Sequence, residues 1–73
     1  MTKRSVTING HATSISLEAP FWQELKRMAG EAGLSVAALI AGIDADRKTG
    51  NLSSALRLAV LNDLKARIGA DWR

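Results

Sequence analysis

The chain has no cysteine and no tyrosine, and it contains only one histidine and one proline among its 73 residues. Without cysteine no disulfide can brace the domain, and a lone His11 cannot complete a zinc site. No apolar run approaches the roughly 18 residues that cross a bilayer. No apolar signal segment follows the first residues, Met1 to Ser5. We therefore expect a cytoplasmic protein that needs no metal or cofactor and does not enter a membrane.

What is present indicates one small folded domain, because 47% of the residues are hydrophobic. A single core in a chain of this size rarely contributes more than roughly 3–5 kcal/mol. With disulfides and metals excluded, oligomerisation is the remaining way to add stability. We therefore expect a homodimer.

The stretch His11 to Leu17 alternates strictly between two kinds of side chain, which is typical of an extended strand with one buried face. One face carries Thr13, Ile15 and Leu17, and the opposite face carries Ala12, Ser14 and Ser16. An isolated strand leaves its backbone donors and acceptors unpaired, which is costly when they are buried. We predict that this strand, over residues 11–17, pairs with the same strand of a second copy.

Residues 1–10 allow two interpretations. Asn9-Gly10 is a strong signal for a two-residue hairpin turn, and it would pair Ile8 with His11 and Val6 with Thr13. Alternatively, these residues form a mobile basic arm, since residues 1–17 contain Lys3 and Arg4 but no acidic residue. A basic segment of this kind is compatible with a polyanionic partner.

Two helices are predicted within residues 18–48. Pro20 fits the first turn of the first helix, whose apolar stripe comprises Phe21, Trp22, Leu25, Met28, Ala29 and Ala32. Gly33 suits the left-handed end of that helix, with Leu34 folding back as a hydrophobic contact, and Ser35 suits the N-cap of the second. The first turn of the second helix, Val36-Ala37-Ala38, has no charged side chain covering its free amides, so it can hold an anion or be capped by water.

A polar turn, Arg47 to Asn51, precedes a third predicted helix over residues 52–68. One apolar stripe of this helix comprises Leu52, Leu56, Val60, Leu64 and Ile68, whereas Leu58 and Leu61 lie well off it. We predict that one side of the helix packs on its own subunit. The other side would pack on a partner chain, which allows dimers to pair into tetramers through residues 52–68.

The acidic residues do not form a catalytic or metal-binding pattern. Asp44 and Asp46 are two residues apart and therefore lie on different faces of a helix. As a calcium loop starting at Asp44, the segment lacks the glycine at its sixth position and has Ala55 in place of the final glutamate. We expect no enzymatic activity.

Four features follow one another between His11 and Ile40. They are an alternating strand, a helix containing Leu25 and Ala29, the turn Gly33 to Ser35 and the pair Leu39-Ile40. In this order they resemble the ribbon-helix-helix family, the Arc and MetJ type of bacterial repressor. The whole chain is similar to a bacterial branch of that family with a C-terminal helical extension. The resemblance implies an α+β fold, mostly α, with an intermolecular two-stranded antiparallel ribbon, two core helices and a third C-terminal helix.

The resemblance also implies a dimeric, sequence-specific regulator whose ribbon enters the major groove of double-stranded DNA. The base-contacting positions would be Ala12, Ser14 and Ser16, and the phosphate-clamping positions would be Ser35, Val36 and Ala37. Lys3 and Arg4 of a flexible arm would reach flanking phosphates. If each subunit instead formed a hairpin, a dimer paired through its strands would have a sheet of four strands. The axes of the outer strands would be about 14 Å apart, so this sheet would be too wide for the groove. We therefore favour the arm. The alternative function is a dimeric protein-interaction or assembly module that uses the apolar third helix.

Overall fold

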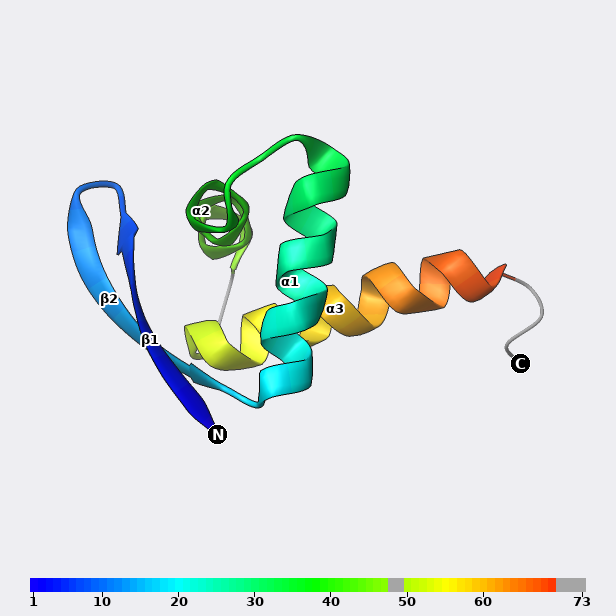
Figure 1. The fold of residues 1–73 in the computed structure, drawn as a ribbon, viewed down its shortest axis with the longest axis horizontal. Helices are drawn as coiled ribbons and strands as arrows, with labels where there is room; N and C mark the ends of the chain where they lie inside the picture. Colours follow the sequence, from blue (N-terminus) through cyan, green and yellow to red (C-terminus); the bar gives the residue numbers. More distant parts are fainter. Residues whose placement is uncertain (48–49, 70–73) are drawn as a thin grey trace.

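The computed structural model describes residues 1–47 and 50–69. A two-stranded sheet precedes three helices (Figure 1), in the order β1 (Thr2–Ile8), β2 (His11–Leu17), α1 (Ala19–Ala32), α2 (Val36–Asp46) and α3 (Leu52–Ile68). The predicted α+β class and the order of ribbon and helices are confirmed, and the predicted ranges 11–17 and 52–68 match β2 and α3. Lys48 and Thr49 of the predicted polar turn lie outside the described residues.

β1 and β2 form an antiparallel hairpin in which Ile8 lies opposite His11 and Val6 opposite Thr13, the register that the hairpin interpretation predicted. The turn residues Asn9 and Gly10 both have positive φ, 51° and 83°. Asparagine and glycine tolerate this conformation, and a two-residue loop costs little chain entropy to close. The interpretation of residues 1–10 as a mobile basic arm, which we favoured, is therefore wrong. The two-stranded ribbon is built within one chain, whereas the resemblance implied one strand from each of two copies.

The hydrophobic core lies between the inner face of the hairpin and the three helices. Its buried members are Ile8, Ile15, Leu17, Trp22, Leu25, Ile40, Leu56 and Val60. Both strands place their apolar residues on the same side because cross-strand partners share a face of the sheet. The helices thus cover the hairpin on one side only, and its opposite side faces solvent.

The ends of α1 and α2 follow their local signals. Pro20 lies in the first turn of α1, and Gly33 ends the helix with a left-handed φ of 71°. The amide of Leu34 donates to the carbonyl of Ala29 over 2.9 Å, but the Leu34 side chain, which we expected to fold back, is 47% exposed. At the start of α2, the hydroxyl of Ser35 accepts from the amide of Ala38 over 3.1 Å, as its predicted capping role requires.

α3 has a packed half and a projecting half. Leu56 and Val60 are buried, whereas Leu64 and Ile68 of the same stripe are 37% and 50% exposed. Figure 1 shows the reason: the C-terminal part of α3 runs past α1 and leaves the body of the protein. Leu58 and Leu61, predicted to lie off the packed stripe, are exposed as well. The part of α3 that packs on its own subunit is therefore shorter than the apolar stripe of the sequence predicted.

No single helix within the described residues is long and apolar enough to cross a membrane. Only α1 and α2 taken together have the length and composition of a membrane span, and the chain bends by 97° at the break between them.

Candidate nucleic-acid interface

The side of the hairpin that faces away from the core carries short polar side chains and one lysine. We call this side the outer face, and it comprises Lys3, Ser5, Thr7, Ala12, Ser14 and Ser16. Lys3 is paired with Ser16, and Ser5 with Ser14, across the two strands. All six residues are exposed except Ser16, which is half-buried. The outer face contains no carboxylate and no large apolar side chain, so it offers hydroxyl groups and a positive charge to a ligand.

Four of the predicted DNA-contacting residues, Lys3, Ala12, Ser14 and Ser16, share this face. Sequence reasoning missed Ser5 and Thr7, although the alternation of β1 about the Asn9-Gly10 turn contained the signal. Two paired strands lie about 4.8 Å apart, and the major groove of B-DNA is about 12 Å wide. One hairpin with its side chains therefore has the width of a groove-reading ribbon.

Arg4 does not lie on the outer face, because it pairs with the buried Ile15 and so points to the helix side of the hairpin. Its guanidinium lies 5.4 Å from the ring centroid of Trp22, within the range of a cation–π contact. The indole nitrogen of Trp22 donates to the carbonyl of Thr2 over 3.0 Å. Trp22 therefore holds the beginning of β1 and the charged group of Arg4 at the same time.

A hollow of about 410 Å³ opens where β1, α1 and the start of α2 meet. It is lined by Arg4, Ser5, Val6, Thr7, Trp22, Lys26, Val36 and Ala37. The structure thus brings Arg4 together with two of the three predicted phosphate-clamping residues. Lys26 was missed by sequence reasoning, yet it lies four residues after Trp22 and so on the same side of α1. Both charged side chains of this hollow are cations.

The beginning of α2 has free amides on the side of this hollow. The Ala38 amide is satisfied by the hydroxyl of Ser35, and the Leu39 amide donates to the Ser35 carbonyl. Among the described residues, the amides of Val36 and Ala37 have no hydrogen-bond partner within the chain, and the first turn has no acidic residue. The partial positive charge of a helix start favours an anion at such a position.

The outer edge of β2 is partly used by α3. In a hairpin closed by a two-residue turn, the backbone groups of Ala12, Ser14 and Ser16 point away from β1. The hydroxyl of Ser53 donates to the carbonyl of Ser16 over 3.2 Å. A further strand that paired along β2 would have to displace this contact.

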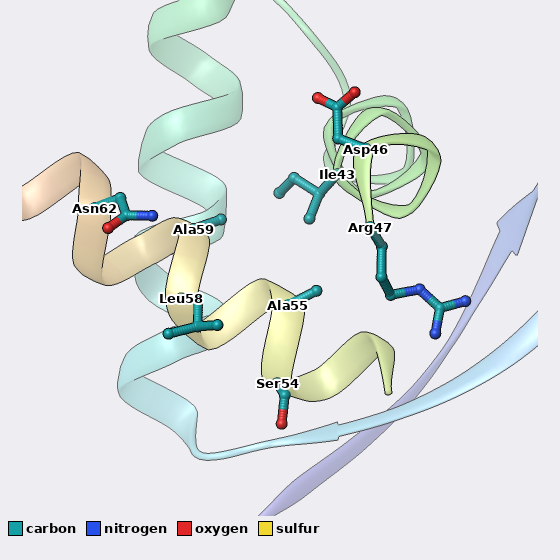
Figure 2. Close-up of a pocket in the computed structure, with 8 residues that line it drawn as sticks. All are labelled: Ile43, Asp46, Arg47, Ser54, Ala55, Leu58, Ala59 and Asn62. Carbon is teal, nitrogen blue, oxygen red and sulfur yellow. The ribbon is translucent and has the colours of Figure 1, made fainter. Parts of the chain in front are cut away.

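The acidic residues are surface groups, as their spacing indicated. Asp44 accepts from Arg47 over 3.0 Å at the end of α2, and no group of three or more metal-binding side chains occurs among the described residues. His11 is exposed beside the hairpin turn. A second hollow, of about 380 Å³, lies between the end of α2 and α3 (Figure 2).

The ribbon-helix-helix domain family matches residues 1–64, and the chain belongs to this family. Proteins of the family are typically DNA-binding transcription regulators, and they bind DNA as dimers. The match extends to Leu64, so most of α3 lies inside the family domain, whereas we expected α3 to be an extension. The comparison gives no match among curated proteins or solved structures.

Proposed function

We propose that this protein is a cytoplasmic transcription regulator that binds double-stranded DNA as a homodimer and reads the major groove with the outer face of its hairpin. The observation that carries the proposal is the outer face itself. It belongs to the ribbon of a ribbon-helix-helix domain, contains no acidic residue and has the width of a two-stranded ribbon. Each copy contributes its own complete ribbon to one half-site.

The positions of the cations support this arrangement. When a hairpin lies in the groove, the edge of β1 faces one of the two sugar-phosphate backbones. The hollow with Arg4, Lys26 and the free amides of α2 opens beside that edge. Phosphate contacts of this type supply a large part of the affinity, whereas base contacts supply the sequence preference.

Base reading by the outer face depends on short side chains. The hydroxyls of Ser14 and Ser16 donate to or accept from base edges, and the methyl group of Ala12 fits against a thymine methyl. Such groups reach less far than arginine or asparagine and discriminate less between bases. We therefore expect moderate sequence preference on top of strong, salt-dependent affinity.

The exposed leucines of α3 favour a second candidate function. Leu58 and Leu61 are 58% and 49% exposed, and a module that binds a partner protein through this helix would use them. Salt concentration separates the two candidates. Binding through phosphates weakens steeply as salt rises, whereas apolar docking does not.

The test is the affinity of the full chain for a pool of random duplexes, measured by fluorescence anisotropy across salt concentrations. Lys3→Ala and Lys26→Ala should each weaken binding to all duplexes alike and make the salt slope shallower by about 1. Arg67→Ala is the matched control, since it removes the same charge far from the hairpin. The absence of salt-dependent binding by the unmodified chain contradicts the proposal.

Sequence preference is tested separately, by selecting duplexes from the same pool. Ser14→Ala and Ser16→Ala should change which sequences are selected while leaving the salt slope unchanged, because a serine hydroxyl carries no charge. Gln23→Ala, on an exposed position of α1, is the control. Selection of the same sequences by all of these variants contradicts base reading by the outer face.

A further inference from the structure

We propose that the open edge of β1 is a docking site for an extended acidic segment of another protein, which adds a strand to the hairpin. The site combines two adjoining features. The first is the edge itself, where the backbone groups of Lys3, Ser5 and Thr7 point away from β2. The second is the hollow of about 410 Å³ beside this edge, whose charged side chains are Arg4 and Lys26. Docking of a segment here goes beyond the proposed function and does not depend on it.

The register of the hairpin determines which backbone groups of β1 are open. Ile8 lies opposite His11 beside a two-residue turn, so these two residues exchange hydrogen bonds. Bonded and non-bonded pairs alternate along an antiparallel ladder, which places Ser5 and Thr7 in non-bonded pairs. Within the described part of the chain, the amides and carbonyls of these two residues have no other hydrogen-bond partner. The sheet has only two strands there, so β1 presents an edge with which a further strand can pair.

The hollow beside the edge favours a negatively charged ligand. Arg4 and Lys26 are exposed, and neither forms an ion pair with a described residue. None of the described residues that line the hollow carries a carboxylate. The amides of Val36 and Ala37 add the partial positive charge of a helix start. An acidic side chain that enters the hollow would therefore meet cations and amide donors, and no like charge.

A polypeptide can use this surface more completely than a phosphate can. A phosphate group accepts hydrogen bonds, so it can pair with the amides of Ser5 and Thr7 but not with their carbonyls. An extended chain offers donors and acceptors at the spacing of a strand edge. The hollow also has an apolar part, formed by the half-buried Val6, Val36 and Ala37, which suits an apolar side chain. The combination of an open edge with this lining points to a peptide segment.

The alternation of β1 determines the sequence pattern of the docked segment. Arg4 and Val6 point to the helix side of β1, and opposite residues on neighbouring strands share a face of the sheet. Antiparallel pairing is the more stable per residue. In that direction the segment carries an apolar residue opposite Val6 and, two positions later, an acidic residue opposite Arg4. The residue between them lies opposite Ser5 and exchanges backbone hydrogen bonds with it.

The first experiment measures amide hydrogen exchange of the full chain by NMR. The probe is a capped peptide of threonines that contains one valine and, two positions later, one glutamate, added at millimolar concentration. The amides of Ser5 and Thr7 should exchange rapidly without the peptide and become protected with it. The amide of Ser14, at the opposite edge, is the reference and should not change. Protection of Ser5 and Thr7 that is absent with the peptide, or already present without it, overturns the proposal.

The second experiment tests the charge of the segment. Glutamine in place of the glutamate should weaken binding of the peptide about fivefold, because exposed ion pairs contribute modestly. Lys26→Ala should weaken binding of the glutamate peptide by a similar factor but leave that of the glutamine peptide nearly unchanged. Arg67→Ala on α3 is the control for the loss of one positive charge. Equal affinity of the unmodified chain for the two peptides overturns the choice of an acidic partner.

The third experiment tests the strand pairing with methylated peptides. N-methylation of the threonine between the valine and the glutamate removes a donor that faces β1, and should weaken binding about tenfold. N-methylation of the valine removes a donor that points away from β1 and is the matched control. Ser5→Pro removes the edge donor without breaking a bond to β2, and should also weaken binding about tenfold once circular dichroism shows that it is folded. Equal effects of the two methylations overturn strand addition.

Competition between the segment and DNA rests on the proposed function, in which this edge and hollow face the phosphates. The glutamate peptide should then displace duplexes from the unmodified chain, whereas simultaneous binding would overturn the competition. Salt-dependent duplex binding without peptide protection of Ser5 and Thr7 refutes the docking site and supports the proposed function. Peptide protection of these amides in a chain that binds no duplex at any salt concentration supports the docking site and refutes the proposed function.

Discussion

The hairpin and the projecting half of α3 lie at opposite ends of the molecule (Figure 1) and are attached by different forces. The hairpin is attached by burial, since Ile15 and Leu17 are almost completely covered by the helices. The projecting half of α3 is attached to α1 by ion pairs. Arg27 contacts Asp63 over 2.6 Å, and Arg67 contacts both Asp63 and Glu31.

The difference determines how each region responds to its surroundings. Apolar burial does not depend on pH and depends weakly on salt, whereas partly exposed ion pairs are screened by salt and are lost when a carboxylate takes up a proton. The guanidinium of Arg27, and to a lesser degree that of Arg67, lowers the pKa of Asp63. The hairpin, which is the proposed DNA-reading element, is thus held by apolar burial, while the projecting half of α3 is held by ion pairs that salt or acid can weaken.

The largest effect is expected at the inner face of the hairpin. Ile15→Asp places a carboxylate at a position that is 1% exposed, among apolar side chains that cannot pair with it. The cost should exceed the roughly 3–5 kcal/mol that a core of this size contributes, so the variant should be unfolded by circular dichroism. Ser14→Asp, the neighbouring position on the outer face, should remain folded. If Ile15→Asp unfolded cooperatively at the melting temperature of the unmodified chain, the burial argument would be wrong.

A smaller effect is expected where the hairpin is tied to α1. Trp22→Phe removes the donor to the Thr2 carbonyl and part of a buried ring, and should lower the free energy of unfolding by about 1–3 kcal/mol. The amides of β1 should also exchange faster with solvent than those of β2. Chemical denaturation and hydrogen exchange measure the two effects, with Gln23→Ala as the control. Equal exchange in the two strands would show that Trp22 does not anchor β1.

The smallest effect is expected at the ion pairs of α3. Because the pKa of Asp63 is lowered in the folded state, its contribution to stability is present at neutral pH and is lost as the pH falls through that lowered pKa. Asp63→Asn should slightly lower the melting temperature at neutral pH and make the remaining decrease in acid less steep. High salt should reduce the difference between the two proteins. An identical pH profile for both proteins would show that these ion pairs do not contribute.

The sequence alone determined the features that depend on neighbouring residues. The strand His11 to Leu17, the left-handed end of α1 at Gly33 and the N-cap at Ser35 were all predicted correctly. Each depends on a local preference, namely alternation, the φ freedom of glycine or a side chain within reach of an amide three residues on. The family resemblance was visible for the same reason, because its motifs lie close together in the chain.

Only the tertiary structure decided what the strand pairs with and how much of α3 is covered. The sequence showed that β2 requires a pairing partner, but both β1 and a second copy of β2 met that requirement. The two-residue turn makes β1 the nearer partner along the chain. The apolar stripe of α3 did not reveal that this helix crosses α1 and runs past it (Figure 1), which leaves Leu64 and Ile68 exposed, since coverage depends on how neighbouring helices cross. The hollow that joins Arg4, Lys26 and the start of α2 was equally hidden, because its residues come from three separate elements that only folding brings together.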